Sequence, residues 1–341
     1  MEIVRCPIFV PRRPTGVRRI LHLLTFAATS FPVLVLQLLW QPRIVMVVAP
    51  TLFAVPVALV LARAVGAVTW LHVQDFDVEA AYQLGLLRTA AMGRFINICE
   101  AWLLRRFDRV STISIAMRAR LEQKGVARER LDLLPNWVDT SVIYPIGVPS
   151  VFRERLGIGN GRVVALYSGA MGAKQGLELI IEAAQLLQAE PVEFVLCGDG
   201  PERTRIGQLA EGLSNLRFLP LQPASELNQL LNLADIHLLP QRPGVADLVM
   251  PSKLAGMLAS GKPVVATAAA DTQVFRAVSG CGRIVAPDDA HGFASAIAEL
   301  AKDPALRAFL GALGRSRAES EMGRAGILND LNRKVSSLAG F

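Results

Sequence analysis

The first part of the chain is short of acidic residues. Between Ile3 and Gln74 there are seven arginines and no aspartate or glutamate, and residues 1–140 carry 17 basic against 10 acidic side chains. Residues 141–341 are balanced at 19 and 19, so the whole net charge of +7 comes from the first part. Such a surface attracts phosphate-rich partners. Because the arginines alternate with aliphatic runs rather than stacking aromatics, and no nucleic-acid-binding signature is present, anionic lipid is favoured over nucleic acid.

Cysteines are also scarce. The four present are scattered and form no Cys-x-x-Cys pair, which argues against a disulfide framework and against a zinc site. Their pattern fits a reducing cytoplasm. A length of 341 residues with 52% hydrophobic content is enough for two cores and predicts two domains.

Two apolar stretches raise the question of a membrane span. The stretch Ile44–Ala62 is uncharged but reads as a buried strand, a turn and a helix broken by Pro56. The stretch Ile20–Trp40 contains several polar residues and follows arginines 12, 13, 18 and 19, which is typical of a basic helix lying on a membrane. We therefore expect an interfacial or core helix before a true span, and a cytoplasmic protein held peripherally on the inner face of the plasma membrane.

The rest of the chain alternates strands with helices, which predicts parallel sheets. The alternation pauses between Pro135 and Pro149 and then resumes, so we expect two parallel α/β domains at 1–143 and 144–320, followed by a helical tail at 321–341. Ligands of such sheets bind beyond the carboxyl ends of strands, so the loops after Tyr167, Cys197 and Leu239 should converge on one site.

Two of those loops are rich in glycine. Ser168–Gly176 holds Gly169, Gly172 and Lys174 before a predicted helix, and Gly198-Asp199-Gly200 follows the next strand. Glycines allow a phosphate to approach the backbone, and a helix start presents free N–H groups. An ordinary glycine-rich turn is an equally good explanation of the first loop taken alone.

A third segment, Asp247–Leu254, is predicted to open a helix with Ser252 and Lys253. Only six basic residues are lysines, and two of them, Lys174 and Lys253, fall at predicted helix openings on the ligand edge. That placement favours a polyanionic ligand, with solvated surface lysines as the alternative.

The end of the strand Val68–Val73 carries further polar groups. Asp75-Phe76-Asp77 matches the Asp-x-Asp pattern by which some glycosyltransferases hold a metal, although two acids so spaced arise easily by chance. His72 is a candidate group facing an acceptor, or equally a satisfied core or loop histidine.

Together these residues resemble glycosyltransferase family 4, retaining enzymes of the GT-B fold, and particularly its members in colanic-acid and other exopolysaccharide biosynthesis. The resemblance covers nearly all of the chain. Its most specific pieces are Tyr167–Glu178, Gly198–Glu202, Asp235–His237, Pro251–Leu254 and Gly261–Val265.

The resemblance implies two Rossmann-like domains facing a cleft and metal-independent, retaining transfer from a UDP or GDP sugar to a lipid-linked or saccharide acceptor. The nucleotide sugar is a co-substrate, and no cofactor or metal is implied. Catalytic candidates are His72, Asp75 and Lys174. Donor-binding candidates are Gly169, Gly172, Lys174, Gly198, Asp199, Gly200, Asp247, Pro251, Ser252, Lys253 and Leu254.

The sequence departs from the family pattern in several places. Leu248 and Gly256 stand where the family usually has two glutamates, and Ala170 replaces a loop arginine. The family's opening strand and glycine-rich loop have no counterpart, so we expect the first domain to be truncated at its start. An active glycosyltransferase is the first hypothesis, and a non-catalytic homologue that binds a membrane or a partner is the second.

Overall fold

The computed structural model describes residues 3–11, 16–49, 54–76, 90–242, 251–270 and 272–340. It divides the chain into two compact units. Unit 1 comprises Met1–Pro135 with Asn329–Phe341, and unit 2 comprises Asn136–Leu328. The domain limits expected from the sequence, after 143 and after 320, stay predictions.

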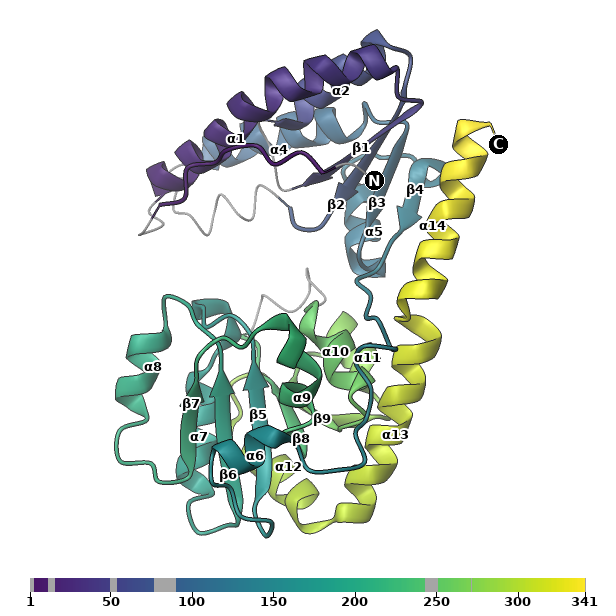
Figure 1. The fold of residues 1–341 in the computed structure, drawn as a ribbon. Helices are drawn as coiled ribbons and strands as arrows, with labels where there is room; N and C mark the ends of the chain where they lie inside the picture. Colours follow the sequence, from purple (N-terminus) through teal and green to yellow (C-terminus); the bar gives the residue numbers. More distant parts are fainter. Residues whose placement is uncertain are drawn as a thin grey trace. The chain divides into compact units, whose positions relative to one another are not determined.

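Unit 1 is built on a four-stranded parallel sheet of order β1-β2-β3-β4 (Figure 1). Its strands are β1 Ile44–Ala49, β2 Val68–Val73, β3 Arg109–Thr112 and β4 Leu131–Leu133. Its helices are α1 Gly16–Gln37, η1 Leu38–Trp40, α2 Ala54–Ala64, α4 Ala90–Leu104, α5 Ile115–Gln123 and η2 Arg128–Arg130, and the end of α14 Arg324–Ala339 also belongs to it. The apolar run of β2 forms a buried strand, as continuous β-branched and aromatic sequences do in parallel sheets.

The stretch Ile44–Ala62 forms a strand and a helix, as its sequence predicts. Pro56 does not break this helix, because α2 begins at Ala54 and so holds the proline in its first turn. A proline is tolerated there because the first helical N–H groups have no partner inside the helix.

Helix α1 lies on the outside of unit 1. The stretch Leu21–Trp40 is long and apolar enough to cross a membrane, and only 6% of it is buried inside the protein. The core-helix alternative for this stretch is therefore wrong. Its exposed large hydrophobic side chains are Leu21, Leu24, Phe31, Val35, Leu36, Leu39 and Trp40.

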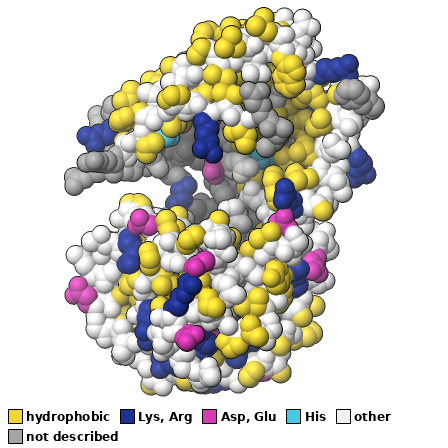
Figure 2. Space-filling model, in the orientation of Figure 1, with side chains coloured by type: hydrophobic (Ala, Val, Ile, Leu, Met, Phe, Trp, Pro, Cys, Tyr) yellow, Lys and Arg dark blue, Asp and Glu magenta, His cyan; other side chains and the backbone are white. Residues whose placement is uncertain are grey.

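The polar side chains of α1 bind the extended segment that precedes it. His22 Nδ1 donates to the carbonyl of Phe9 at 2.6 Å, and the N–H of Phe9 donates to Thr25 Oγ1 at 3.1 Å. Thr29 Oγ1 donates to the carbonyl of Pro7 at 2.6 Å. These three polar side chains thus bind within the protein, while the large hydrophobic side chains named above stay exposed. Figure 2 shows hydrophobic side chains gathered over α1 and α2.

Unit 2 is a six-stranded parallel sheet of order β10-β9-β8-β5-β6-β7. Its strands are β5 Val163–Ser168, β6 Val192–Cys197, β7 Leu216–Leu219, β8 Ile236–Leu239, β9 Val264–Thr267 and β10 Gly282–Val285. Its helices are α6 Val151–Arg155, η3 Ala173–Gln175, α7 Glu178–Leu186, α8 Arg203–Leu209, η4 Ala224–Glu226, α9 Leu227–Leu231, α10 Lys253–Ala259, α11 Gln273–Val278, α12 Ala290–Lys302, α13 Pro304–Glu321 and the start of α14.

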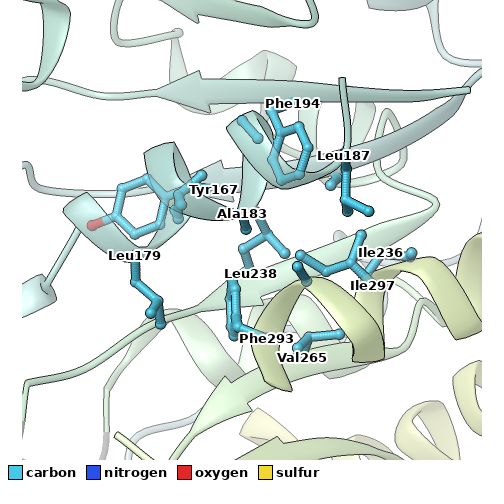
Figure 3. Packing of buried hydrophobic residues seen from close by; sticks show 14 of the residues in the cluster. Tyr167, Leu179, Ala183, Leu187, Phe194, Ile236, Leu238, Val265, Phe293 and Ile297 are labelled. Atoms are coloured by element: carbon cyan, nitrogen blue, oxygen red, sulfur yellow. The ribbon is translucent and has the colours of Figure 1, made fainter. Parts of the chain in front are cut away.

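The main core of unit 2 lies between this sheet and helices α7 and α12. Figure 3 shows Tyr167 and Phe194 of the sheet together with Phe293 and Ile297 of α12, and all four are fully buried. The strand order reverses at β5, which has β6 on one side and β8 on the other. In open parallel sheets such a reversal leaves a crevice at the carboxyl ends of the strands, where ligands bind.

Candidate donor-binding site

The loops after β5 and β6 run against each other, backbone to backbone. The N–H of Gly169 donates to the carbonyl of Cys197 at 3.0 Å, and the N–H of Met171 donates to the carbonyl of Asp199 at 2.8 Å. A Cβ on Gly200 would lie 2.4 Å from the carbonyl oxygen of Met171. The glycines here are needed because the two loops touch, and they leave a surface of backbone beyond the strand ends.

Lys253 is the first residue of α10 and reaches toward this surface. A Cβ built on Gly169 would lie 3.5 Å from Lys253 Nζ. The Nζ atom is buried and, within the described ranges, has no hydrogen-bond partner. Burial lowers the pKa of Lys253 to about 7. A buried ammonium group without an acceptor is costly, so its place beside a glycine loop at the strand reversal suits an anionic ligand.

Lys174 lies elsewhere than the sequence predicts. It is exposed in the single turn η3, and α7 begins only at Glu178, after Gly176 in a left-handed conformation at φ +58°. Lys174 therefore does not open the long helix, since Gly176 separates the turn from it. Its carbonyl accepts the N–H of Arg242 at 3.2 Å, which fixes the turn to the loop after β8.

Two arginines that the sequence analysis missed meet at this edge. Glu178 accepts a hydrogen bond from Arg242 at 2.6 Å and another from Arg205. Burial alone would raise the pKa of Glu178, but its hydrogen bonds and the neighbouring arginines lower it overall. Arg242 thus places a second cation close to the loop of Lys174, where Ala170 replaces the family arginine. The sequence could have indicated Arg242 as a site residue, because Arg242 lies three residues beyond the end of β8, at the ligand edge of the sheet.

The remaining donor candidates are placed in different ways. Gly172 donates its N–H to Gln175 Oε1 at 3.1 Å, and a Cβ built on Gly172 would lie 3.0 Å from the same oxygen. Pro251 and Ser252 immediately precede α10, and Ser252 is exposed without a capping hydrogen bond. Leu254 is completely buried in the core, so its side chain cannot meet a ligand. Asp247 lies outside the described residues.

In unit 1, His72 belongs to a buried hydrogen-bond chain. Gln74 Nε2 can only donate, so it donates to His72 Nε2 at 2.8 Å, which assigns the ring proton to Nδ1. Nδ1 then donates to Ser111 Oγ at 2.9 Å, and Trp70 Nε1 donates to the same oxygen at 2.8 Å. Burial lowers the pKa of His72 to about 4, so the ring is neutral near pH 7. Both ring nitrogens of His72 thus have hydrogen-bond partners inside the protein, which agrees with the alternative of a core histidine.

Asp75 is half-buried just beyond β2, and Asp77 lies outside the described residues. Across the part of the chain that the structure describes, no three or more histidine, cysteine, aspartate or glutamate side chains gather in a group able to hold a metal ion.

Family models match most of the chain. Residues 1–137 match the model of a glycosyl transferase 4-like domain, and residues 162–303 match that of the glycosyl transferases group 1. The chain is 40% identical over 277 residues to the glycosyl transferase WcaI of Escherichia coli K12, assigned to colanic acid biosynthesis, and the match covers 79% of this chain and 68% of WcaI. The chain belongs to glycosyltransferase family 4.

The chain is also similar to more distant proteins, both in sequence and in structure. The phosphatidyl-myo-inositol mannosyltransferase of Mycolicibacterium smegmatis is 24% identical over 243 residues, covering 70% of this chain and 59% of that protein. Among solved structures, Anabaena HepE in complex with UDP-glucose superposes with a TM-score of 0.72 at 18% identity, covering 95% and 84% of the two chains. Sucrose-phosphate synthase from Thermosynechococcus elongatus gives 0.75 at 20%, covering 96% and 81%. The GT-B fold expected from the sequence is confirmed.

Proposed function

We propose that this glycosyltransferase moves a sugar from a nucleotide-diphosphate donor to a lipid-linked or saccharide acceptor in cell-envelope polysaccharide synthesis. The observation that carries the proposal is the buried Nζ of Lys253, which lies beside Gly169 at the strand reversal of unit 2 and has no hydrogen-bond partner in the part of the chain that the structure describes. Two solved neighbours support the donor class, because HepE was captured with UDP and with UDP-glucose. The match to WcaI supports the polysaccharide pathway.

The donor diphosphate would lie against the glycine loops with Lys253 below it and Lys174 at its exposed side. When the bond between sugar and phosphate breaks, negative charge grows on the departing diphosphate. Fixed positive charge and free N–H groups stabilise that charge best in the transition state, which lowers the barrier without a metal ion. Retention of anomeric configuration is the stereochemistry implied by the family resemblance.

The acceptor would be met at the membrane. Helix α1 exposes several large hydrophobic side chains, and Arg18 near the start of the helix is also exposed. Arginine next to an apolar helix face favours shallow insertion into an anionic leaflet. A peripheral position on the inner face of the plasma membrane would bring the enzyme to a lipid-linked acceptor.

The non-catalytic alternative rests on Gly256 and Leu248 in place of the family glutamates. A direct test is to incubate the protein with a panel of UDP and GDP sugars and with vesicles containing lipid-diphosphate saccharides, and to identify products by mass spectrometry and anomeric configuration by NMR. Transfer in the presence of EDTA, with retained configuration, is expected. Tight binding of a nucleotide without transfer to any acceptor would favour the non-catalytic homologue. The absence of nucleotide binding would overturn the proposal.

A further inference from the structure

Besides the glycine loop, an aromatic side chain lies close to Lys253. Its Nζ lies 3.9 Å from the centroid of the Tyr167 ring. A Cβ on Gly169 would lie 3.3 Å from Lys253 Cδ and 3.8 Å from Tyr167 Oη, so the three residues occupy one small volume. An ammonium group over an aromatic face is attracted by the electron density of the ring.

The Tyr167 ring is held rigidly. It is fully buried at the carboxyl end of β5, where it packs in the main core of unit 2 (Figure 3). Its hydroxyl donates to the carbonyl of Ala170 at 2.6 Å, which fixes the ring to the glycine loop itself. The strand, the loop and the lysine are therefore connected through this one side chain.

The surroundings of Lys253 Nζ contain no ionic partner among the described residues. Burial accounts for its lowered pKa, with no carboxylate contributing. Burial also raises the pKa of the Tyr167 hydroxyl, so the phenol stays protonated and offers no negative charge. Asp247, the nearest acid before α10 in the sequence, lies outside the described residues.

We propose that Tyr167 is a positioning residue of the donor site, whose ring holds the Lys253 ammonium beside Gly169 until a diphosphate binds there. This inference rests on the proposed function for its ligand. The ring attracts a cation only weakly and accepts none of its N–H groups in an ordinary hydrogen bond, so a phosphate can bind the ammonium without displacing an ionic partner from the described residues. A carboxylate in the same place would have to be displaced.

Lysine NMR can test the proposal without activity, because the chain has only six lysines. With ¹³Cε-labelled lysine, the Lys253 signal is assigned by its loss in Lys253→Arg. The ring current of Tyr167 should shift this signal upfield of the other five in the absence of nucleotide. Tyr167→Phe keeps the ring and should keep the shift, whereas Tyr167→Leu should lose it. A wild-type Lys253 signal without any upfield shift would overturn the positioning role, whether or not the variants fold.

UDP binding gives the second measurement. Tyr167→Leu should weaken UDP affinity by roughly tenfold, because a partly desolvated cation–π interaction contributes a free energy of that order. Tyr167→Phe keeps the ring, so its UDP affinity should stay within about threefold of the wild type. Tyr144→Leu, at an exposed tyrosine of unit 2, is the matched control. Unchanged affinity in a folded Tyr167→Leu protein would refute this inference alone. Failure of the wild type to bind any nucleotide would instead refute the proposed function. The upfield shift of the Lys253 signal would still show whether Lys253 lies over the Tyr167 ring.

UDP should also change the titration of Lys253. Bound phosphate favours the charged amine, so the midpoint of the Lys253 signal should move to higher pH when UDP is added. Above pH 7 the phosphates of UDP are already ionised, because their second pKa is about 6. UDP affinity should therefore fall as the pH rises from 7 to 9. An affinity that does not change over this range would contradict a free, ligand-directed Lys253.

Discussion

A Cβ placed on Gly198 would lie 1.9 Å from the carbonyl oxygen of Gly169. No side chain can occupy that space, and the φ of Gly198 is +151°, in the region that favours glycine. The close contact between the loops after β5 and β6 is therefore possible only because residue 198 has no Cβ atom. Whatever binds on one loop meets a surface whose shape depends on the other.

Gly198→Ala should force the two loops apart. We expect a marked fall in melting temperature, and weaker UDP binding in whatever protein remains folded, because a backbone contact cannot move aside as a flexible side chain can. Gly159→Ala is the control, since a Cβ there meets nothing within 4 Å and the φ is ordinary. Equal stability of the two variants in thermal melts would contradict the contact.

Lys253→Met should stabilise the protein without ligand. The folded pKa of Lys253 is about 7, below its unfolded value of 10.5, so the unfolded state holds more protons between these values. Stability of the wild type should therefore rise with pH from 7 toward 10.5, and the burial cost should be largest at or below pH 7. Removing the buried charge should raise the free energy of unfolding by about 1–4 kcal/mol at pH 7.

Urea denaturation at pH 7 and pH 9 measures this effect, with the exposed Lys174→Met as the matched control. The advantage of Lys253→Met should shrink at pH 9. A Lys253→Met protein that is less stable than the wild type at pH 7 would mean that the ammonium has a stabilising partner beyond the Tyr167 ring.

Two buried histidines should make the protein sensitive to mild acid. Burial lowers the pKa of His72 to about 4 and that of His237 to about 3, while both titrate near 6.5 when unfolded. The unfolded state therefore binds more protons below pH 6.5, and stability should fall as the pH falls from 6.5 toward 4. Each histidine should cost about 2 kcal/mol at pH 5.

Thermal melts between pH 7 and pH 5 check this expectation. His237→Asn should flatten the pH dependence of the unit 2 transition, whereas His291→Asn, at an exposed position of α12, should leave it unchanged. An unaltered slope in His237→Asn would show that other groups cause the acid sensitivity.

The exposed face of α1 should bind anionic vesicles. Phe31→Ser removes an apolar side chain that is 49% exposed, and Arg18→Glu reverses a charge worth about 1 kcal/mol near an acidic surface. Both should weaken cosedimentation with vesicles, while Phe309→Ser, at a 62% exposed site of unit 2, should have no effect. High salt or carbonate should release the wild type from membranes. Retention after both washes would indicate a true span instead.

The sequence predicts much of the fold because its apolar runs and turn residues alternate so regularly. Strands β5, β6 and β8 end within one residue of the strand ends expected at Tyr167, Cys197 and Leu239, and a glycine-rich loop follows each of the first two.

The errors have physical causes. Lys174 and Lys253 look alike in sequence, each near a predicted helix start, but Gly176 stops the first turn and leaves Lys174 exposed. Leu254 directly follows three donor-binding candidates, Pro251, Ser252 and Lys253, yet its place on helix α10 points its side chain into the core. Tyr167 and Arg242 were missed as site residues because their roles depend on contacts between segments far apart in the sequence, which no local pattern records.

The binding of UDP to the wild type, Lys174→Ala and Lys253→Met, measured by calorimetry at pH 7 beside Lys302→Ala, tests the donor site most directly. Lys302 forms an exposed ion pair with Glu190 at 2.9 Å, so its loss should leave binding unchanged. We expect weaker binding in both other variants and, where transfer is measured, a rate loss of roughly 100- to 1,000-fold for Lys174→Ala, by analogy with removal of one oxyanion donor. UDP affinity and turnover that stay at the wild-type level in both Lys174→Ala and Lys253→Met would contradict the proposed donor site.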